Sequence, residues 1–181
     1  MQTRSLMSLV LAAATTLSLA ACGSDSGVAP TPMPTPQPAP TPAPVFRTGE
    51  IVALQADNGL YLSRIRRAGG IDPVEAAKSG IDQYSRFNVT VLEDGRIALS
   101  ADNGRFLSRI RRNGNDPVEA SKDGIDDYSR FTVTMLDAQT VALQGDNGMY
   151  LSRIRRGDID PIEAAKATID FYSRFRITRL Q

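Results

Sequence analysis

The chain repeats one segment three times. Residues 57–67, which read Asp-Asn-Gly-Leu-Tyr-Leu-Ser-Arg-Ile-Arg-Arg, return with few changes at residues 102–112 and 146–156, so the copies start 45 and 44 residues apart. Asp-Pro at 72, 116 and 160 and Tyr-Ser-Arg-Phe from 84, 128 and 172 keep the same period. A fixed period of roughly 20–50 residues is typical of repeat architectures, whose units bury an apolar face only against one another. The fold must therefore join three equivalent units, and a site built from repeated residues should occur three times.

The first 21 residues have the composition of a secretory signal peptide. A single basic residue, Arg4, precedes an apolar run that starts at Leu6 and ends in small residues. The run is short and rich in Ala, Thr and Ser, which favours a cleaved signal over a permanent membrane span. We therefore assign residues 1–21 to a signal peptide.

This segment ends in Leu-Ala-Ala-Cys at residues 19–22, and Cys22 is the only cysteine of the chain. The junction resembles the bacterial lipobox, in which a diacylglycerol is attached to the cysteine and cleavage leaves that cysteine first. The alternative is an ordinary signal peptide with a chance cysteine. The resemblance implies a lipoprotein that palmitate-type acyl chains on Cys22 attach to a lipid bilayer. Because Gly23 lacks the aspartate that favours inner-membrane retention, we expect the protein in the cell envelope, at the outer membrane or cell surface.

Residues 22–45 form a linker. Proline occupies every second position from Pro30 to Pro44, which accounts for eight of the eleven prolines. Because proline fixes φ and lacks a backbone donor, the segment should be a disordered, extended chain. At ~3.1 Å per residue, it would hold a domain on the order of 70 Å from a membrane. We interpret it as a spacer, with a polyproline ligand as the alternative.

Charge and composition exclude several classes of protein. Removal of the signal peptide removes Arg4 and no acid, so 21 − 1 = 20 basic residues face 20 acidic ones and the formal charge is zero. Nucleic-acid binders normally carry a basic excess, so we expect no nucleic-acid partner. The absence of histidine excludes the usual catalytic triads and Cys/His zinc sites. Each Asp-Asn-Gly triplet offers one carboxylate, too few for a calcium loop, so no metal or cofactor is expected.

The pattern within a repeat predicts β-strands. An alternating apolar run at residues 52–55 is followed by Asp-Asn-Gly and a second run at residues 60–65. Asn-Gly between two such runs indicates a hairpin, because both residues tolerate positive φ. Residues 87–92 alternate again and are rich in β-branched residues. Residues 72–78 fit either a helical turn opened by Asp-Pro or a short strand.

Residues 52–63 and their copies resemble the Ala-Leu-x-Ala-x-Asn-Gly-x-Tyr-Leu-Ser motif of the fascin-like β-trefoil family. The resemblance covers residues 49–181. It implies an all-β domain over residues 46–181, a β-trefoil of three ~44-residue repeats at 49–92, 93–136 and 137–181. It also implies a third strand at residues 74–78. Trefoils include cytokines, lectins, inhibitors and actin cross-linkers, so the fold does not assign the function. Fascins bundle actin with four trefoils in tandem, whereas this chain has one.

Threefold equivalence also predicts the core. The inward-facing positions are expected to be Leu54, Leu99 and Leu143; Leu62, Leu107 and Leu151; Ile65, Ile110 and Ile154; Phe87, Phe131 and Phe175; and Val89, Val133 and Ile177. The position occupied by Val91, Met135 and Arg179 accepts a charged residue in one copy, so it should lie at the surface.

Arginine is the polar residue that the repeats share most. Ser-Arg-Ile-Arg-Arg supplies nine equivalent arginines. Nine acids recur beside them: Asp72, Glu75, Asp82, Asp116, Glu119, Asp126, Asp160, Glu163 and Asp170. The matched counts favour Arg–carboxylate pairing across strands or repeats, often with two bonds per pair. Alternatively, Arg67, Arg112 and Arg156 bind an anionic ligand at up to three weak, similar sites beside the Gly/Asn/Asp-rich loops, with Asp158 weakening the third.

The repeated tyrosines also have two interpretations. Tyr84, Tyr128 and Tyr172 either cover the core with the hydroxyl at the surface or offer stacking platforms to sugar rings. The Gln-x-Trp motif of ricin-type lectins is missing. Paired carboxylates are the machinery of glycosidases, but a catalytic pair is normally unique, and here every acid of the set recurs in each repeat. We therefore expect no enzyme.

These features predict a membrane-anchored lipoprotein that displays a non-catalytic β-trefoil. The trefoil would bind an envelope or extracellular partner, either a glycan or a protein. The alternative is a structural or interaction protein of fascin-like, actin-cross-linker-like fold without a small ligand. A hydrolase is the least favoured alternative.

Overall fold

The computed structural model describes residues 45–112 and 114–180. The signal peptide, Cys22 and nearly all of the predicted linker lie outside the described residues. In the described part of the chain, no helix is long and apolar enough to cross a membrane.

Each repeat contributes four strands. Repeat 1 contains β1 (Ile51–Gln55), β2 (Tyr61–Arg64), β3 (Val74–Lys78) and β4 (Phe87–Val91). Repeat 2 contains β5 (Ile97–Ser100), β6 (Phe106–Arg109), β7 (Val118–Lys122) and β8 (Thr132–Met135). Repeat 3 contains β9 (Thr140–Gln144), β10 (Tyr150–Arg153), β11 (Ile162–Lys166) and β12 (Phe175–Leu180). The 3-10 turns are η1 (Ala68–Gly70), η2 (Gln83–Ser85), η3 (Asp127–Ser129) and η4 (Phe171–Ser173).

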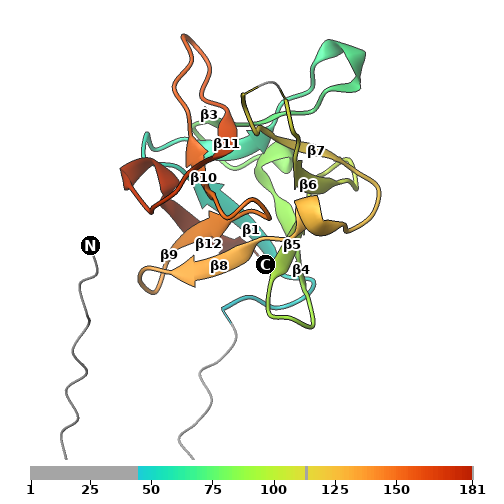
Figure 1. The fold of residues 1–181 in the computed structure, drawn as a ribbon, viewed down its shortest axis with the longest axis vertical. Helices are drawn as coiled ribbons and strands as arrows, with labels where there is room; N and C mark the ends of the chain where they lie inside the picture. The colour runs from blue at the N-terminus through green and yellow to red at the C-terminus, as the bar shows by residue number, and fades with distance from the viewer. Residues whose placement is uncertain (1–44, 113, 181) are drawn as a thin grey trace, which may run out of the picture. The chain divides into compact units, whose positions relative to one another are not determined.

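Six strands close a barrel. β1 pairs with β4 and β12, β4 with β5, β8 with β9, and β9 with β12. A bridge between Ile97 and Phe131 joins β5 to the start of β8, where the Ile97 N–H donates to the Phe131 carbonyl over 2.9 Å. The other strands form the hairpins β2–β3, β6–β7 and β10–β11, whose loops project from one end of the barrel (Figure 1). This arrangement is the predicted β-trefoil, which is confirmed.

The segment at residues 74–78 is a strand, so the helical alternative is wrong. β3 pairs with β2 along its length. In addition, the Ala76 N–H donates to the Asp160 carbonyl of repeat 3 over 2.9 Å. These long-range partners satisfy an extended backbone better than one isolated helical turn would, because a helix this short is marginal by itself.

The hairpins predicted at Asn-Gly form, but only the glycine of each pair, and not the asparagine, has a positive φ. Gly59 has φ 79°, a left-handed conformation that glycine adopts without strain. The Asn58 side-chain oxygen accepts a hydrogen bond from the Leu60 N–H over 3.0 Å, which closes the turn. The same geometry recurs at Gly104 and Gly148, so the three β1–β2-type connections are equivalent.

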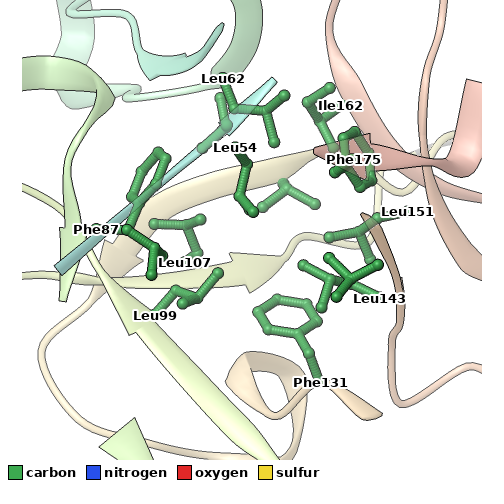
Figure 2. Close-up of a cluster of buried hydrophobic side chains, with 14 of the residues drawn as sticks. Leu54, Leu62, Phe87, Leu99, Leu107, Phe131, Leu143, Leu151, Ile162 and Phe175 are labelled. Carbon is green, nitrogen blue, oxygen red and sulfur yellow. The ribbon is translucent and has the colours of Figure 1, made fainter. Parts of the chain in front are cut away.

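The core is built from equivalent positions of the repeats. Phe87, Phe131 and Phe175 are fully buried, at 0% exposure, and lie with the leucines in one cluster (Figure 2). The predicted leucines are all buried: Leu54, Leu62, Leu99, Leu107, Leu143 and Leu151. The core also contains residues that the prediction missed, namely Val52, Ile97 and Val141, and Val74, Val118 and Ile162.

Some predicted core positions are wrong. Ile65, Ile110 and Ile154 are only half-buried and lie outside the core cluster. The strand ends one residue earlier, at Arg64 in repeat 1, so the isoleucine leaves the inward alternation. Val133 is half-buried and packs against the core, whereas Val89 and Ile177 are buried within it.

The three copies of the position that was predicted to lie at the surface differ in burial. Val91 and Met135 are half-buried against the core. Arg179 is exposed, and its Nε lies 2.7 Å from the Glu50 carboxylate. Only the third copy therefore behaves as predicted.

Residues 46–181 should fold without the N-terminal segment, and removal of residues 93–136 from them should abolish folding. The deletion removes β5 and β8 from the barrel and one third of the phenylalanine core, so the remaining apolar face stays exposed. Far-UV circular dichroism with thermal melts tests both statements. A cooperative melt of the two-repeat protein as a monomer would contradict the shared core, while assembly into larger oligomers would rebuild the missing repeats.

Candidate functional site

One buried arginine per repeat holds the hairpin turn of the next repeat. Arg109 Nε and Nη2 donate to the two carboxylate oxygens of Asp146 over 2.6 and 2.5 Å, and Nη1 donates to Asp116 over 3.1 Å. The Arg109 side chain is 5% exposed. The equivalent sets are Arg64 with Asp102 and Asp72, and Arg153 with Asp57 and Asp160. Repeat 1 thus holds repeat 2, repeat 2 holds repeat 3, and repeat 3 holds repeat 1.

The asparagine of each turn adds a hydrogen bond to the same joint, that is, to the contact between the arginine of one repeat and the turn of the next. Asn147 Nδ2 donates to Asp116 Oδ2 over 3.0 Å, so Asp116 receives bonds from both the arginine of its own repeat and the turn of the next. Asn58 with Asp160 and Asn103 with Asp72 repeat this contact. From the sequence, the Asp-Asn-Gly triplet was expected only to shape the hairpin turn. In the structure it also joins neighbouring repeats. The hydrogen bonds that Arg109 donates to Asp146 raise the pKa of Arg109 above its ordinary value, so the guanidinium stays charged although burial opposes it.

The repeated tyrosines cover these ion pairs. The Tyr128 ring lies 5.1 Å from the Arg109 guanidinium carbon and 5.5 Å from Lys122 Nζ. Tyr84 and Tyr172 occupy the equivalent positions over Arg64 and Arg153. Cations over an aromatic face are attracted by its quadrupole, so the first interpretation of the tyrosines, a covering role, has a physical basis. Tyr128 also lines a hollow of about 220 Å³ with Ile110 and Lys122.

The aspartate two residues before each of these tyrosines caps a 3-10 turn. The Asp126 carboxylate receives hydrogen bonds from Ser129 and pairs with Lys122 Nζ at 2.7 Å. Burial alone would raise the pKa of Asp126, but the bonds from Lys122 and Ser129 outweigh it and hold that pKa below its ordinary value. Because the folded-state pKa is lowered, this group stabilises the fold above its unfolded-state pKa and loses that contribution as pH falls through the folded-state value.

The last arginine of each repeat pairs with a glutamate. Arg112 Nη2 lies 2.5 Å from Glu119 Oε1, and Arg156 Nη2 lies 2.8 Å from Glu163 Oε1. Arg67 pairs with Glu75 in the same way. The predicted Arg–carboxylate pairing is therefore present at the candidate binding residues. The two partners of each pair differ in solvent exposure: the three arginine side chains are 42–47% exposed and the glutamate side chains 6–7%.

These three pairs surround one pocket. β3, β7 and β11 meet there, since the Ala120 N–H donates to the Asp72 carbonyl and the Ala164 N–H to the Asp116 carbonyl, each over 2.9 Å. The resulting axial pocket has a volume of about 290 Å³. Its walls are Arg67, Arg112 and Arg156; Glu75, Glu119 and Glu163; Pro73, Pro117 and Pro161; and Ile71, Asn115 and Ile159. The sequence predicted up to three separate anion-binding sites, whereas the fold brings the three arginines to one pocket.

Two further hollows lie in single loops. One, of about 530 Å³, is lined by Arg66, Arg67 and η1, and the other, of about 450 Å³, by Arg111, Arg112 and the residues that follow Asn113. Each is lined by residues of one loop. Asp158, which was expected to weaken the third copy, does not line the axial pocket.

Burial affects the pKa of the pocket glutamate Glu163. The pKa of Glu163 lies above its ordinary value because burial disfavours the charged form and outweighs the attraction of Arg156, with Asp116 adding repulsion. Arg156 therefore offsets part of the cost of burying the Glu163 carboxylate.

The fold is shared with proteins of very different sequence. No family model matches the chain, and no curated protein matches it in sequence. A mosquitocidal holotoxin superposes with a TM-score of 0.64 at 10% identity over 75% of this chain and 18% of the toxin, so this chain spans under a fifth of the toxin's length. The designed three-fold symmetric protein ThreeFoil gives 0.58 at 15% identity, over 72% and 99% of the two chains. SeviL bound to asialo-GM1 saccharide gives 0.55 at 13% identity, over 74% and 100%. Identities this low show the fold alone, and the fascin-like resemblance stays a prediction.

Replacing Arg109 by methionine should destabilise the fold by up to about 3 kcal/mol, the lower end of the range for breaking a buried ion pair, because Asp146 and Asp116 would lose their partner while partly buried. Urea denaturation measures the free energy of unfolding. Arg111→Met is the matched control, since Arg111 lies two residues further along, beyond the end of β6, and is exposed. Equal effects of the two substitutions would contradict the role of Arg109 as a joint between repeats.

Proposed function

We propose that this protein is an envelope lipoprotein that displays a non-catalytic glycan-binding β-trefoil. The observation that carries the proposal is the convergence of the loops of the three hairpins at one end of the barrel, where the last arginines of the repeats remain half-exposed. The first described segment, drawn in cyan before β1, lies toward the other end of the domain (Figure 1). A linker entering there would leave the loop end free to meet a ligand.

The arrangement of charges supports binding rather than catalysis. The recurring acids are engaged: Asp116 holds an arginine and an asparagine, Glu119 holds Arg112, and Asp126 holds Lys122. A general acid or base needs a carboxyl group free to exchange protons with a substrate. SeviL, a trefoil of 13% identity, is described with a bound saccharide, which supports the compatibility of this fold with glycans.

One feature favours a second candidate, a protein partner without a small ligand. Phe171 and Tyr172 are 64% and 43% exposed, and their rings meet edge to face with centroids 6.0 Å apart. Exposed aromatic residues are enriched at protein interfaces. Repeats 1 and 2 have Gln83 and Asp127 in place of Phe171, so this surface belongs to repeat 3 alone.

Cys22 should be diacylated and become the first residue of the mature protein. Two or more acyl chains are needed for stable attachment, because a single chain binds a membrane only marginally. Cells expressing the wild type and Cys22→Ser are labelled with a palmitate analogue, and label is expected on the wild type only. Equal labelling of the two proteins would refute the lipid anchor and leave the binding function of the trefoil to be judged separately.

The binding function is tested on a glycan array that carries neutral and anionic glycans, with the full-length protein kept in detergent. We expect selective binding to a subset of glycans, without cleavage of the bound glycan. Absence of any glycan binding, together with a purified protein partner whose binding is lost in Phe171→Ala, would favour the second candidate.

A further inference from the structure

We propose that the axial pocket binds one carboxylated sugar ring per chain, so that the trefoil recognises acidic rather than neutral glycans. This inference rests on the proposed glycan-binding function.

The pocket is one composite site. Arg67, Arg112 and Arg156 come from three different repeats and line the same 290 Å³ space. The pairing of β3, β7 and β11 around the pocket fixes their mutual positions. The loop hollows lack this property, because each is lined by residues of one loop with no wall opposite. A ligand in the axial pocket therefore meets three guanidinium groups at once, one from each repeat.

The arginines retain donors for an anion. A guanidinium has five N–H donors. Within the described part of the chain, the hydrogen bonds of Arg67, Arg112 and Arg156 use at most two of them each. The formal charges of the three arginines and three glutamates cancel, but the arginines are 42–47% exposed and the glutamates only 6–7%. A ligand that arrives from solvent therefore meets the cations first, and a carboxylate matches the planar guanidinium geometry.

The remaining walls favour a ring over a bare ion. Pro73, Pro117 and Pro161 supply apolar surface, and Ile71 and Ile159 extend it. A pocket of about 290 Å³ lies just below the usual range for ligand sites, roughly 300–1,000 Å³, which suits one ring rather than a chain of sugars. An inorganic anion would leave the apolar walls without contact, whereas the C–H face of a sugar acid would cover them.

One residue breaks the symmetry of the pocket. Asn115 stands where the other repeats have Ile71 and Ile159, and its Oδ1 accepts a hydrogen bond from Arg156 Nη2 over 2.9 Å. This contact orients the side-chain amide, whose nitrogen retains donors for a sugar hydroxyl. A ring bound against Asn115 would therefore adopt one orientation among three that perfect symmetry would make equal.

The test measures binding of glucuronate, glucose and inorganic sulfate to full-length protein in detergent by calorimetry. We expect glucuronate to bind one to one, with an affinity that falls as salt rises, and glucose and sulfate to bind at least about tenfold more weakly. Glu119→Gln should tighten glucuronate binding by about fivefold, because it removes a negative charge beside Arg112 and keeps a hydrogen-bond acceptor. Arg112→Gln should weaken it by about the same factor.

Arg111→Gln is the matched control. It removes the same charge one residue away, from a side chain that does not line the axial pocket, so the affinity should stay unchanged. Melting temperatures confirm that each variant is folded. If Arg112→Gln does not fold, Glu119→Gln still decides, because a merely structural pair predicts no gain in affinity. The inference would be overturned if glucose or sulfate bound as tightly as glucuronate, or if three glucuronate molecules bound per chain. Equal effects of the substitutions at Arg111 and Arg112 would also overturn it. Binding of neutral glycans on the array would overturn it and leave the proposed function standing.

Discussion

The cyclic contact between one arginine and the next repeat's turn is the constraint on which the rest of the structure depends. Arg64 reaches Asp102 and Arg109 reaches Asp146 across 38 and 37 residues, but Arg153 must reach Asp57 across 96 to close the ring. Removing charges from water is costly, and the bidentate geometry with a second aspartate offsets that cost only when all partners are in place. The joint therefore favours three repeats in a ring over two repeats or an open chain.

Arginines only three residues apart have different physical roles because the strand ends between them. Arg109 is the last residue of β6 and is buried under Tyr128. Arg112 lies beyond the strand, half-exposed, with its glutamate partner beneath the surface. Arg109 uses its hydrogen-bond donors to hold neighbouring repeats together, whereas Arg112 keeps some of its donors for a ligand. One short motif thus supplies both the joint between repeats and the candidate site.

Local signals predicted the fold better than they predicted the contacts. The Asn-Gly turns and the period of the repeats, together with the resemblance to the fascin-like motif, led to the trefoil, because hairpin geometry is set within a few residues. The pairing of Arg153 with Asp57 depends on closure of the barrel, so nothing near either residue indicates it. The same limit explains Ile65, whose apolar character fits a core position although the strand has already ended. The choice of strand over helix at residues 74–78 likewise depends on partners from other repeats.

Symmetry changes what a repeated residue means for function. Sequence repetition alone predicts three copies of a site, yet residues close to a threefold axis meet their own copies and form one site instead. Arg67, Arg112 and Arg156 are in this second situation, whereas Tyr84, Tyr128 and Tyr172 cover three separate ion pairs. Duplication would at first give such a pocket three identical walls, which suit only symmetric ligands. A single replacement at the axis, such as asparagine at position 115 where the other repeats have isoleucine, is then enough to give an asymmetric ligand a preferred orientation, while the joints farther from the axis keep all three copies.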